Sequence, residues 1–313
     1  MEYNYPKFTP EMKLTHTILI PNMAITQFRL LEYALRYDGY KCEILGNCGS
    51  AVAQLGLKYV HNDTCYPALL VIGQFLDALN SGKYDLDHTA LLITQTGGGC
   101  RASNYIKLLR KALVKAGYGN IPVASLNFSG LEKGSGLPLT VPLLRKVIAS
   151  IFYGDMLVAL RSQTHAYENH RGDADAMTEK WISAIQGWIR DDKNYSAHDM
   201  KRRFYDIAAD YATIPITRVP KVKVGVVGEI YVKYSPLGNN DLEKFLESQD
   251  CEVNLPGLMG FVEYCVANYK LDIDLYGGNK LVAGGADAFL SWLDGIGCAS
   301  YDAMRKYGFY APG

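Results

Sequence analysis

Two cysteines lie where a helix is expected to begin, a setting that can make a thiol chemically active. Cys100 follows the three consecutive glycines 97–99, which end an apolar stretch with the sequence ALLITQ. Cys65 lies two residues before Pro67, and proline suits the first turn of a helix because its missing N–H needs no partner there. The positive end of a helix dipole favours a thiolate, so both cysteines are candidate metal ligands or nucleophiles.

The glycine turn itself is a candidate ligand cradle. Gly97, Gly98 and Gly99 let the backbone turn sharply and approach a ligand, and the amides of the helix that follows would face it. Arg101 and Asn104 come next and are candidates to line the site. The turn lacks the Gly-Lys-Ser/Thr of a P-loop and does not match GxGxxG. A small-molecule site that cradles phosphate or CoA, or a plain strand-to-helix turn with a core cysteine, remain alternatives.

The cysteines do not form a local motif. There are seven, spread along the chain without any CxxC pair: Cys42, Cys48, Cys65, Cys100, Cys251, Cys265 and Cys298. An odd and dispersed set argues against a disulfide framework, a zinc ribbon or a thioredoxin-type pair. Most of them are expected in the core, while a few can converge in space on a metal cluster.

Composition and charge exclude some classes of function. Of 313 residues, 49% are apolar and 20% charged, which is ordinary for a globular protein. Lys plus Arg and Asp plus Glu both count 32, so no basic surface for nucleic acid is expected. The sequence contains no run of 18 apolar residues and no secretory signal at its start. We therefore expect no membrane span and a cytoplasmic location.

The first part of the chain alternates strands and helices. Short apolar runs predict strands, at 17–20, 42–45, 90–94 and 121–126. Helical spacing and helix-start signals predict helices, at 26–38, 50–58, from Cys65 onward and at 103–116. This pattern indicates an α/β fold, with a Rossmann-like or flavodoxin-like parallel-sheet domain at 1–139. If the first and third strands are neighbours, the loops after them share a crevice.

The rest of the chain is expected to form a helical bridge at 140–219 and a second α/β domain at 220–313. The bridge is predicted to contain helices at 143–162, 174–191 and 198–212, with His165, His170 and His198 as solvated or capping residues. The second domain looks incomplete because only two strands are predicted, at 222–227 (buried) and 252–255. Its other predicted elements are a loop at 231–238, helices at 240–248 and 258–268, and two short helices after Gly277. Glu229, after the first of these strands, is either a contribution to a cleft or a solvated turn residue.

Three segments in combination resemble a known family. The segments DTCYPALLVIGQ, QTGGGCRASNY and GVVGEIYVKYSPLGNNDLEKFL are similar to those of activase-related proteins of the 2-hydroxyacyl-CoA dehydratase and benzoyl-CoA reductase superfamily, over residues 17–265. The resemblance implies an iron–sulfur cluster, [4Fe–4S] or larger, held by cysteines between Rossmann-like lobes. Cys65 and Cys100 match the cluster cysteines. The amides of the glycine turn would offset the negative charge of the cluster. Arg101 and Asn104 would line the site, and Glu229 would be the contribution of the second domain to the same cleft.

The resemblance also implies partners and a reaction class. An ATP-dependent activase would deliver electrons to the chain. The chain would use them for low-potential reductive chemistry on CoA thioesters or other small substrates, as part of anaerobic metabolism. It would act as an oligomer or together with a dehydratase subunit. The activase's own ATP-binding motifs are absent, so no ATP hydrolysis by this chain is expected. A cubane cluster normally takes four thiolates. The missing ligands would come from Cys48, a partner chain or a solvent-derived species. The alternative is a non-catalytic binding or assembly subunit of the same fold without a cluster.

Overall fold

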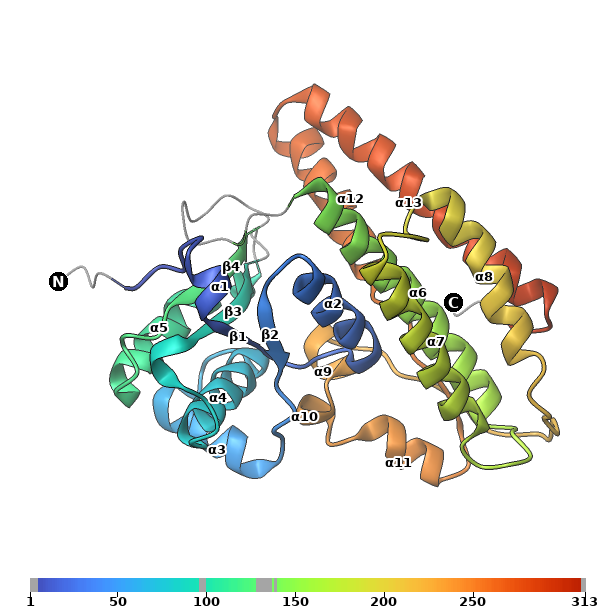
Figure 1. The fold of residues 1–313 in the computed structure, drawn as a ribbon, viewed down its shortest axis with the longest axis horizontal. Helices are drawn as coiled ribbons and strands as arrows, with labels where there is room; N and C mark the ends of the chain where they lie inside the picture. Colours follow the sequence, from blue (N-terminus) through green and yellow to red (C-terminus); the bar gives the residue numbers. More distant parts are fainter. Residues whose placement is uncertain (1–4, 96–99, 128–136, 138–139, 311–313) are drawn as a thin grey trace. The chain divides into compact units, whose positions relative to one another are not determined.

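The computed structural model describes residues 5–95, 100–127, 137 and 140–310, and the chain divides into two compact units. Unit 1 comprises Met1–Leu143 and Tyr234–Asp241, and unit 2 comprises Leu144–Lys233 and Leu242–Gly313. Figure 1 shows a sheet with helices in unit 1 and mostly helices in unit 2. The predicted α/β class is confirmed, since unit 1 holds a four-stranded parallel sheet and unit 2 a small second one. The segments predicted as bridge and second domain fall in one unit, apart from residues 140–143 and 234–241.

The sheet of unit 1 consists of β1 (Thr17–Ile20), β2 (Lys41–Ile44), β3 (Thr89–Gln95) and β4 (Val123–Asn127). Its strands are all parallel, in the order β2-β1-β3-β4. Six of the seven residues of β3 are buried, as expected where helices cover both faces of a parallel sheet. The four strands were predicted to within two residues, because each is a short apolar run bounded by turn residues.

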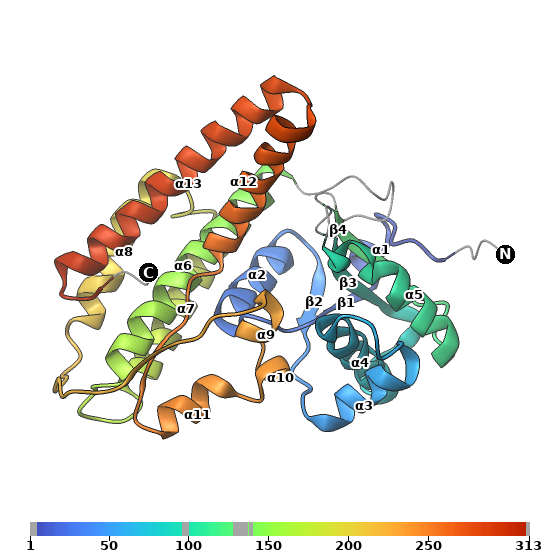
Figure 2. The same ribbon diagram turned by 180° about the vertical axis from the view of Figure 1, so that it is seen from behind.

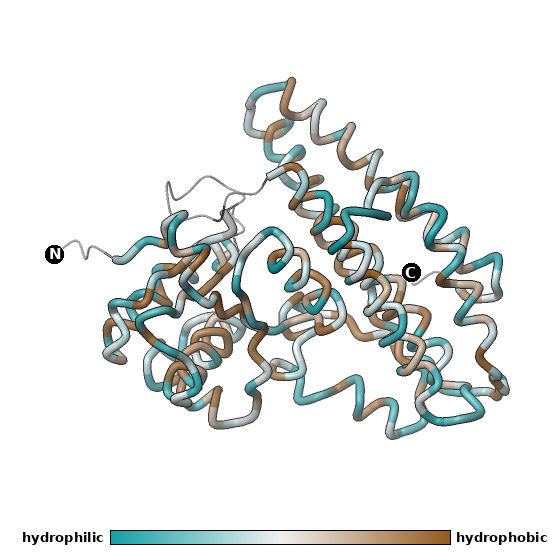
Figure 3. The backbone as a smooth tube through the Cα atoms, viewed as in Figure 1, coloured by the Kyte–Doolittle hydropathy of each residue, from teal (hydrophilic) through white to brown (hydrophobic). Residues whose placement is uncertain are grey.

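The helices of unit 1 are α1 (Met12–Thr15), α2 (Ile25–Tyr37), α3 (Ser50–Tyr59), α4 (Tyr66–Asn80), α5 (Tyr105–Ala116) and α10 (Pro236–Asn239), with 3-10 turns η1 (Leu86–His88) and η2 (Arg101–Asn104). Helix α2 packs against β2, and α5 packs against β3 and β4. Helix α4 is hydrophobic over much of its length (Figure 3) and almost wholly buried. Its burial fixes the position of its first residues, where Cys65 lies.

Two glycines let α3 and α4 cross at very short distance. A Cβ added at Gly56 would lie 2.2 Å from the carbonyl oxygen of Leu69, and one at Gly73 would lie 2.2 Å from that of Val52. Real Cβ atoms do not approach a backbone oxygen this closely, so any larger residue forces the two helices apart. The pair of glycines therefore sets how α4 is placed in unit 1.

Unit 2 is built mainly from helices. They are α6 (Val141–His165, in unit 2 from residue 144), α7 (Asp173–Arg190), α8 (Ala197–Tyr211), α9 (Ile230–Tyr234), α11 (Leu242–Ser248), α12 (Met259–Tyr276) and α13 (Lys280–Lys306). Strands β5 (Lys223–Gly225) and β6 (Glu252–Asn254) form a two-stranded parallel sheet. Helices α12 and α13 form an antiparallel hairpin, visible in Figures 1 and 2, and α13 also packs on α8.

Three predictions for 220–313 were wrong. The strand predicted as buried at 222–227 is only β5, and Val222 and Val227 on either side of it are 68% and 81% exposed. The loop predicted at 231–238 contains most of α9 and of α10. The N-cap of α10 is Ser235, whose hydroxyl accepts from the Gly238 amide. The two short helices predicted after Gly277 are the single helix α13, because packing against α8 and α12 outweighs the cost of its internal glycines.

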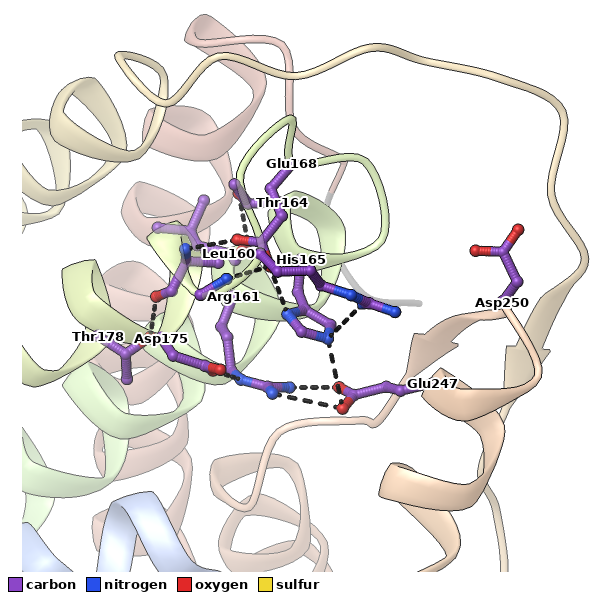
Figure 4. A network of polar contacts seen from close by, with 12 residues as sticks. Leu160, Arg161, Thr164, His165, Glu168, Asp175, Thr178, Glu247 and Asp250 are labelled. Atoms are coloured by element: carbon purple, nitrogen blue, oxygen red, sulfur yellow. Dashed lines mark hydrogen bonds and ion pairs between the residues drawn. The ribbon is translucent and has the colours of Figure 1, made fainter.

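A polar network ties α6 to α7 and α11 inside unit 2 (Figure 4). Arg161 contacts the carboxylates of Asp175 and Glu247, the first at 2.6 Å. His165 lies 2.9 Å from the carboxylate of Glu168 through Nδ1 and 3.6 Å from that of Glu247 through Nε2. His165 was expected to be a solvated or capping residue, and the solvated alternative was wrong, since its side chain is only 12% exposed. The carboxylate of Glu168 also accepts from two amides at the start of α7.

Candidate functional site

The strand order of unit 1 changes direction between β1 and β3, which is where a crevice was expected. The chain passes from β1 outward to β2 and then returns to β3 on the other side of β1. The condition stated for a shared crevice, that the first and third strands are neighbours, is therefore met. In open parallel sheets, ligands bind beyond the carboxyl ends of the strands at such a switch point. The residues after β1 and after β3 are therefore the first place to look for a site.

Cys65 lies immediately before the first residue of α4. It is the N-cap residue, in agreement with the helix expected from Cys65 onward. Its side chain is half-buried, and the hydroxyl of Tyr105 donates to its Sγ over 3.1 Å. Pro67 occupies the first turn of the helix, as predicted. The positive end of the α4 dipole therefore lies beside a thiol that already has a hydrogen-bond donor.

Cys100 lies at the corresponding position before η2, and it is exposed to solvent. The next residue, Arg101, donates from Nη1 to the carbonyl oxygen of Asp63 over 3.2 Å. Tyr105, which contacts Cys65, begins the helix that follows η2. Two side-chain contacts thus join the segment that carries Cys100 to the segment that carries Cys65.

The other residues proposed for the site fall into three groups. Gly97, Gly98 and Gly99 lie outside the described residues. Asn104 is exposed at the N-cap of α5. Glu229 belongs to unit 2, where its carboxylate accepts from the amide of Val232 over 2.9 Å at the start of α9. This contact gives Glu229 a local capping role.

A buried glutamine connects the loops after β1 and β2 with α4. Gln74 is 1% exposed; its Oε1 accepts from the amide of Asn22 over 3.2 Å, and its Nε2 donates to the carbonyl of Asn47 over 2.9 Å. The side-chain amide of Asn47 donates in turn to the Gln74 carbonyl and to Asp77 Oδ2, over 2.9 and 2.8 Å. Sequence reasoning missed this network, although one glutamine inside the apolar run ALLVIGQFL was a usable signal.

A second buried glutamine supports the segment after the glycine turn. Gln95, the last residue of β3, is 1% exposed and donates from Nε2 to the carbonyl of Ser103 over 2.9 Å. The hydroxyl of Ser125 donates to its Oε1 over 3.3 Å. The path of the chain beyond Cys100 is therefore held by a side chain from the end of β3, one of the two inner strands. No local sequence signal predicts this contact.

Three buried polar atoms near these loops have no partner among the described residues: Asn22 Oδ1, Asn47 Oδ1 and Ser103 Oγ. Leaving a buried donor or acceptor unpaired costs about 1–3 kcal/mol. They follow β1, β2 and β3, respectively, so the carboxyl edge of the sheet has free capacity to bind a polar ligand.

The thiols present fit part of the ligand set of an iron–sulfur cluster. All seven cysteines are described. Cys42 is excluded as a cluster ligand because its side chain is buried, and burial raises the pKa of its thiol to about 12. Cys48 is exposed in the loop after β2. Among the described residues, no three His, Cys, Asp or Glu side chains gather closely enough to hold a metal ion. Unit 1 therefore presents Cys65 and Cys100 on joined segments, with Cys48 as a further thiol at the same edge of the sheet.

Comparisons with protein-family models, curated proteins and solved structures gave no match. Within the described ranges, no helix combines the length and the apolar character that a membrane span requires.

Proposed function

We propose that the chain is a cytoplasmic iron–sulfur protein of the 2-hydroxyacyl-CoA dehydratase and benzoyl-CoA reductase type, with Cys65 and Cys100 as cluster ligands. The observation that carries the proposal is the pair of contacts that joins the two cysteine segments, from Tyr105 to the Cys65 sulfur and from Arg101 to Asp63. Both cysteines precede helical turns, where the backbone amides favour negatively charged groups.

Each residue around the cysteines has a physical role in this proposal. The hydroxyl of Tyr105 orients the Cys65 sulfur and stabilises negative charge on it. Arg101 holds the two segments together and places a positive charge beside them. A cysteine-ligated iron–sulfur cluster supplies electron transfer at a potential tuned by such hydrogen bonds and charges. This chemistry suits low-potential reduction of a CoA thioester or another small substrate, with electrons delivered by an ATP-dependent activase.

The incomplete ligand set implies a further donor. Two thiols do not satisfy a [4Fe–4S] cluster, which normally takes four. Cys48 is the one additional cysteine in a loop at the carboxyl end of the unit 1 sheet. We therefore expect the remaining positions to be filled by Cys48, by a solvent-derived species or by a second chain in an oligomer or in a dehydratase complex.

The proposal is tested by purifying the protein without oxygen and measuring iron, acid-labile sulfide and electron paramagnetic resonance after reduction. We expect iron and sulfide in the wild type and a loss of most of both in Cys65→Ser and in Cys100→Ser. Cys251→Ser is the matched control, because Cys251 is half-exposed and belongs to unit 2. An iron-free wild type, or full iron content in both variants, would contradict the assignment.

A binding or assembly subunit without a cluster is the second candidate. The helical hairpin of α12 and α13 exposes large apolar side chains, among them Leu275, Tyr276 and Leu281 at 64%, 83% and 86%. Apolar residues this exposed are typical of surfaces that bind another protein. Measuring the molecular mass of the chain with and without an activase or dehydratase subunit distinguishes this candidate from the iron–sulfur protein. Complex formation by an iron-free chain, unaffected by Cys65→Ser, supports the subunit.

A further inference from the structure

Unit 2 contains a cavity of about 250 Å³ between α6, α12 and α13. Its wall carries acidic, hydroxyl and apolar side chains from all three helices. They include Asp155 and Met156 of α6, Glu263 of α12, and Asp294, Ser300 and Met304 of α13. All of these residues belong to unit 2, whereas Cys65 and Cys100 belong to unit 1.

The cavity is negatively charged. Its three carboxylates are Asp155, Glu263 and Asp294, and no lysine, arginine or histidine is among the described residues that line it. Asp155 has a structural use, since it accepts from the amides of Leu258 and Met259 over 2.9 and 2.8 Å at the start of α12. Within the described chain, Glu263 and Asp294 form no ion pair.

Two further features of Glu263 and Asp294 favour a cationic occupant. The pKa of Glu263 is raised, mainly by burial and to a smaller extent by the negative charges of Asp294 and Asp155. Repulsion between these carboxylates is therefore not balanced by a positive charge on the described residues that line the cavity. Asp294 is exposed and places a carboxylate where the cavity meets solvent. A cation that entered past Asp294 and reached Glu263 would relieve this repulsion.

Ser300 gives an independent indication of a ligand. It is only 6% exposed and lies on the cavity wall, yet its hydroxyl has no hydrogen-bond partner among the described residues. Its oxygen is not fully shielded from solvent, so it is available to a ligand in the cavity. An N–H group in the cavity would provide that partner.

The chemistry of the wall selects the class of cation. The three carboxylates do not form a metal site, since no three His, Cys, Asp or Glu side chains of the described chain are arranged to hold one ion. Phe152, Met156 and Met304 supply an apolar surface, and methionine adapts readily to ligands of different shape. We propose that this cavity binds a small organic cation, with an ammonium group at Glu263 and Asp294 and an apolar body against the methionines and Phe152.

The test is calorimetric titration of the full chain with 2-phenylethylamine, and with 2-phenylethanol as its uncharged analogue. We expect the amine to bind at least about tenfold more tightly than the alcohol, because the carboxylates pair only with the charged head. Glu263→Gln and Asp294→Asn should each weaken binding of the amine by about tenfold or more. Asp302→Asn is the matched control on α13, because Asp302 is 62% exposed and contacts Arg305 instead of the cavity.

A space-filling variant tests the location without altering charge. A Cβ at Gly297 would lie 3.8 Å from the ring of Phe152, so Gly297→Leu adds volume to the cavity without a severe clash. We expect this variant to lose binding while its circular dichroism stays that of the wild type. Failure of the amine to bind, equal affinity for amine and alcohol, or wild-type affinity in both Glu263→Gln and Asp294→Asn would overturn the proposal.

Discussion

At the scale of single residues, Cys65 and Cys100 lie directly before helical turns, on two segments that side-chain contacts join. Proline in a first helical turn and a glycine run after an apolar strand are local signals, and they needed no knowledge of the rest of the fold. The contacts that join the two segments could not be predicted, because Tyr105 reaches Cys65 across 40 residues and Arg101 reaches Asp63 across 38. Such pairs are created by the crossing of helices and strands.

The reactivity of the cysteines should follow their surroundings. Cys42 is buried, and burial raises the pKa of its thiol to about 12, so the thiolate is scarce at pH 8 and alkylation of the folded protein should be very slow. In the metal-free protein, the exposed Cys48, Cys100, Cys265 and Cys298 should react first with iodoacetamide. Mass spectrometry of timed samples measures this order. Labelling of Cys42 as fast as the exposed cysteines, before unfolding, would show that it is not a core residue.

The Tyr105 hydroxyl should tune the proposed cluster. Tyr105→Phe removes the donor to the Cys65 sulfur and keeps the ring, so we expect iron to be retained and the reduction potential to fall. The direction follows because a donor to a ligand sulfur stabilises the more negative, reduced state. Tyr118→Phe is the control, since its hydroxyl contacts Asn80 instead. Potentiometric titration followed by electron paramagnetic resonance gives both values, and an unchanged potential in Tyr105→Phe would refute this role.

At the scale of elements, the parallel sheet was predictable, and the second half of the chain was less so. The strands β1 to β4 are short apolar runs with clear ends, whereas α13 contains internal glycines such as Gly284 and Gly285 that indicate a break. The helix continues through them because α8 and α12 pack against it. Local helix propensity predicts secondary structure poorly where long-range packing determines it. The same reason explains why α9 and α10 were predicted as a loop.

The close crossing of α3 and α4 leads to a stability prediction. Gly73→Ala places a Cβ 2.2 Å from the Val52 carbonyl oxygen, so we expect a loss of about 1–3 kcal/mol. Gly284→Ala is the control within a helix, where a Cβ meets nothing within 4 Å and alanine should stabilise by about 1 kcal/mol. Urea unfolding followed by circular dichroism compares the two. Equal midpoints for Gly73→Ala and the wild type would show that the two helices do not cross so closely.

The Arg161 network leads to a second stability prediction. Arg161→Met leaves the partly buried Glu247 without its cation, and we expect a loss of about 3 kcal/mol. Arg305→Met removes a pair that is more than 60% exposed on both sides, so its effect should be below about 1 kcal/mol. Thermal unfolding at equal ionic strength measures both variants. A similar loss in the two would mean that the network in Figure 4 adds no more than a surface ion pair.

At the scale of the whole molecule, the chain carries two candidate sites of different chemistry. Unit 1 presents thiols and amides at the carboxyl edge of a parallel sheet, and unit 2 presents carboxylates around a cavity between helices. The first was accessible to sequence reasoning because cysteines and glycine turns are recognisable along the chain. The second was not, since Asp155, Glu263 and Asp294 lie on three helices and come together only through packing.

The central claim is that Cys65 and Cys100 face one common site, and crosslinking tests it most directly. Dibromobimane becomes fluorescent when it links two neighbouring thiols, and peptide mapping identifies the cysteines that it joins. We predict a bridged peptide pair containing Cys65 and Cys100 in the reduced, metal-free protein, which should be lost in Cys65→Ser and kept in Cys251→Ser. Bridging of either cysteine only to another thiol, or single labelling of both without a bridge, would contradict the account.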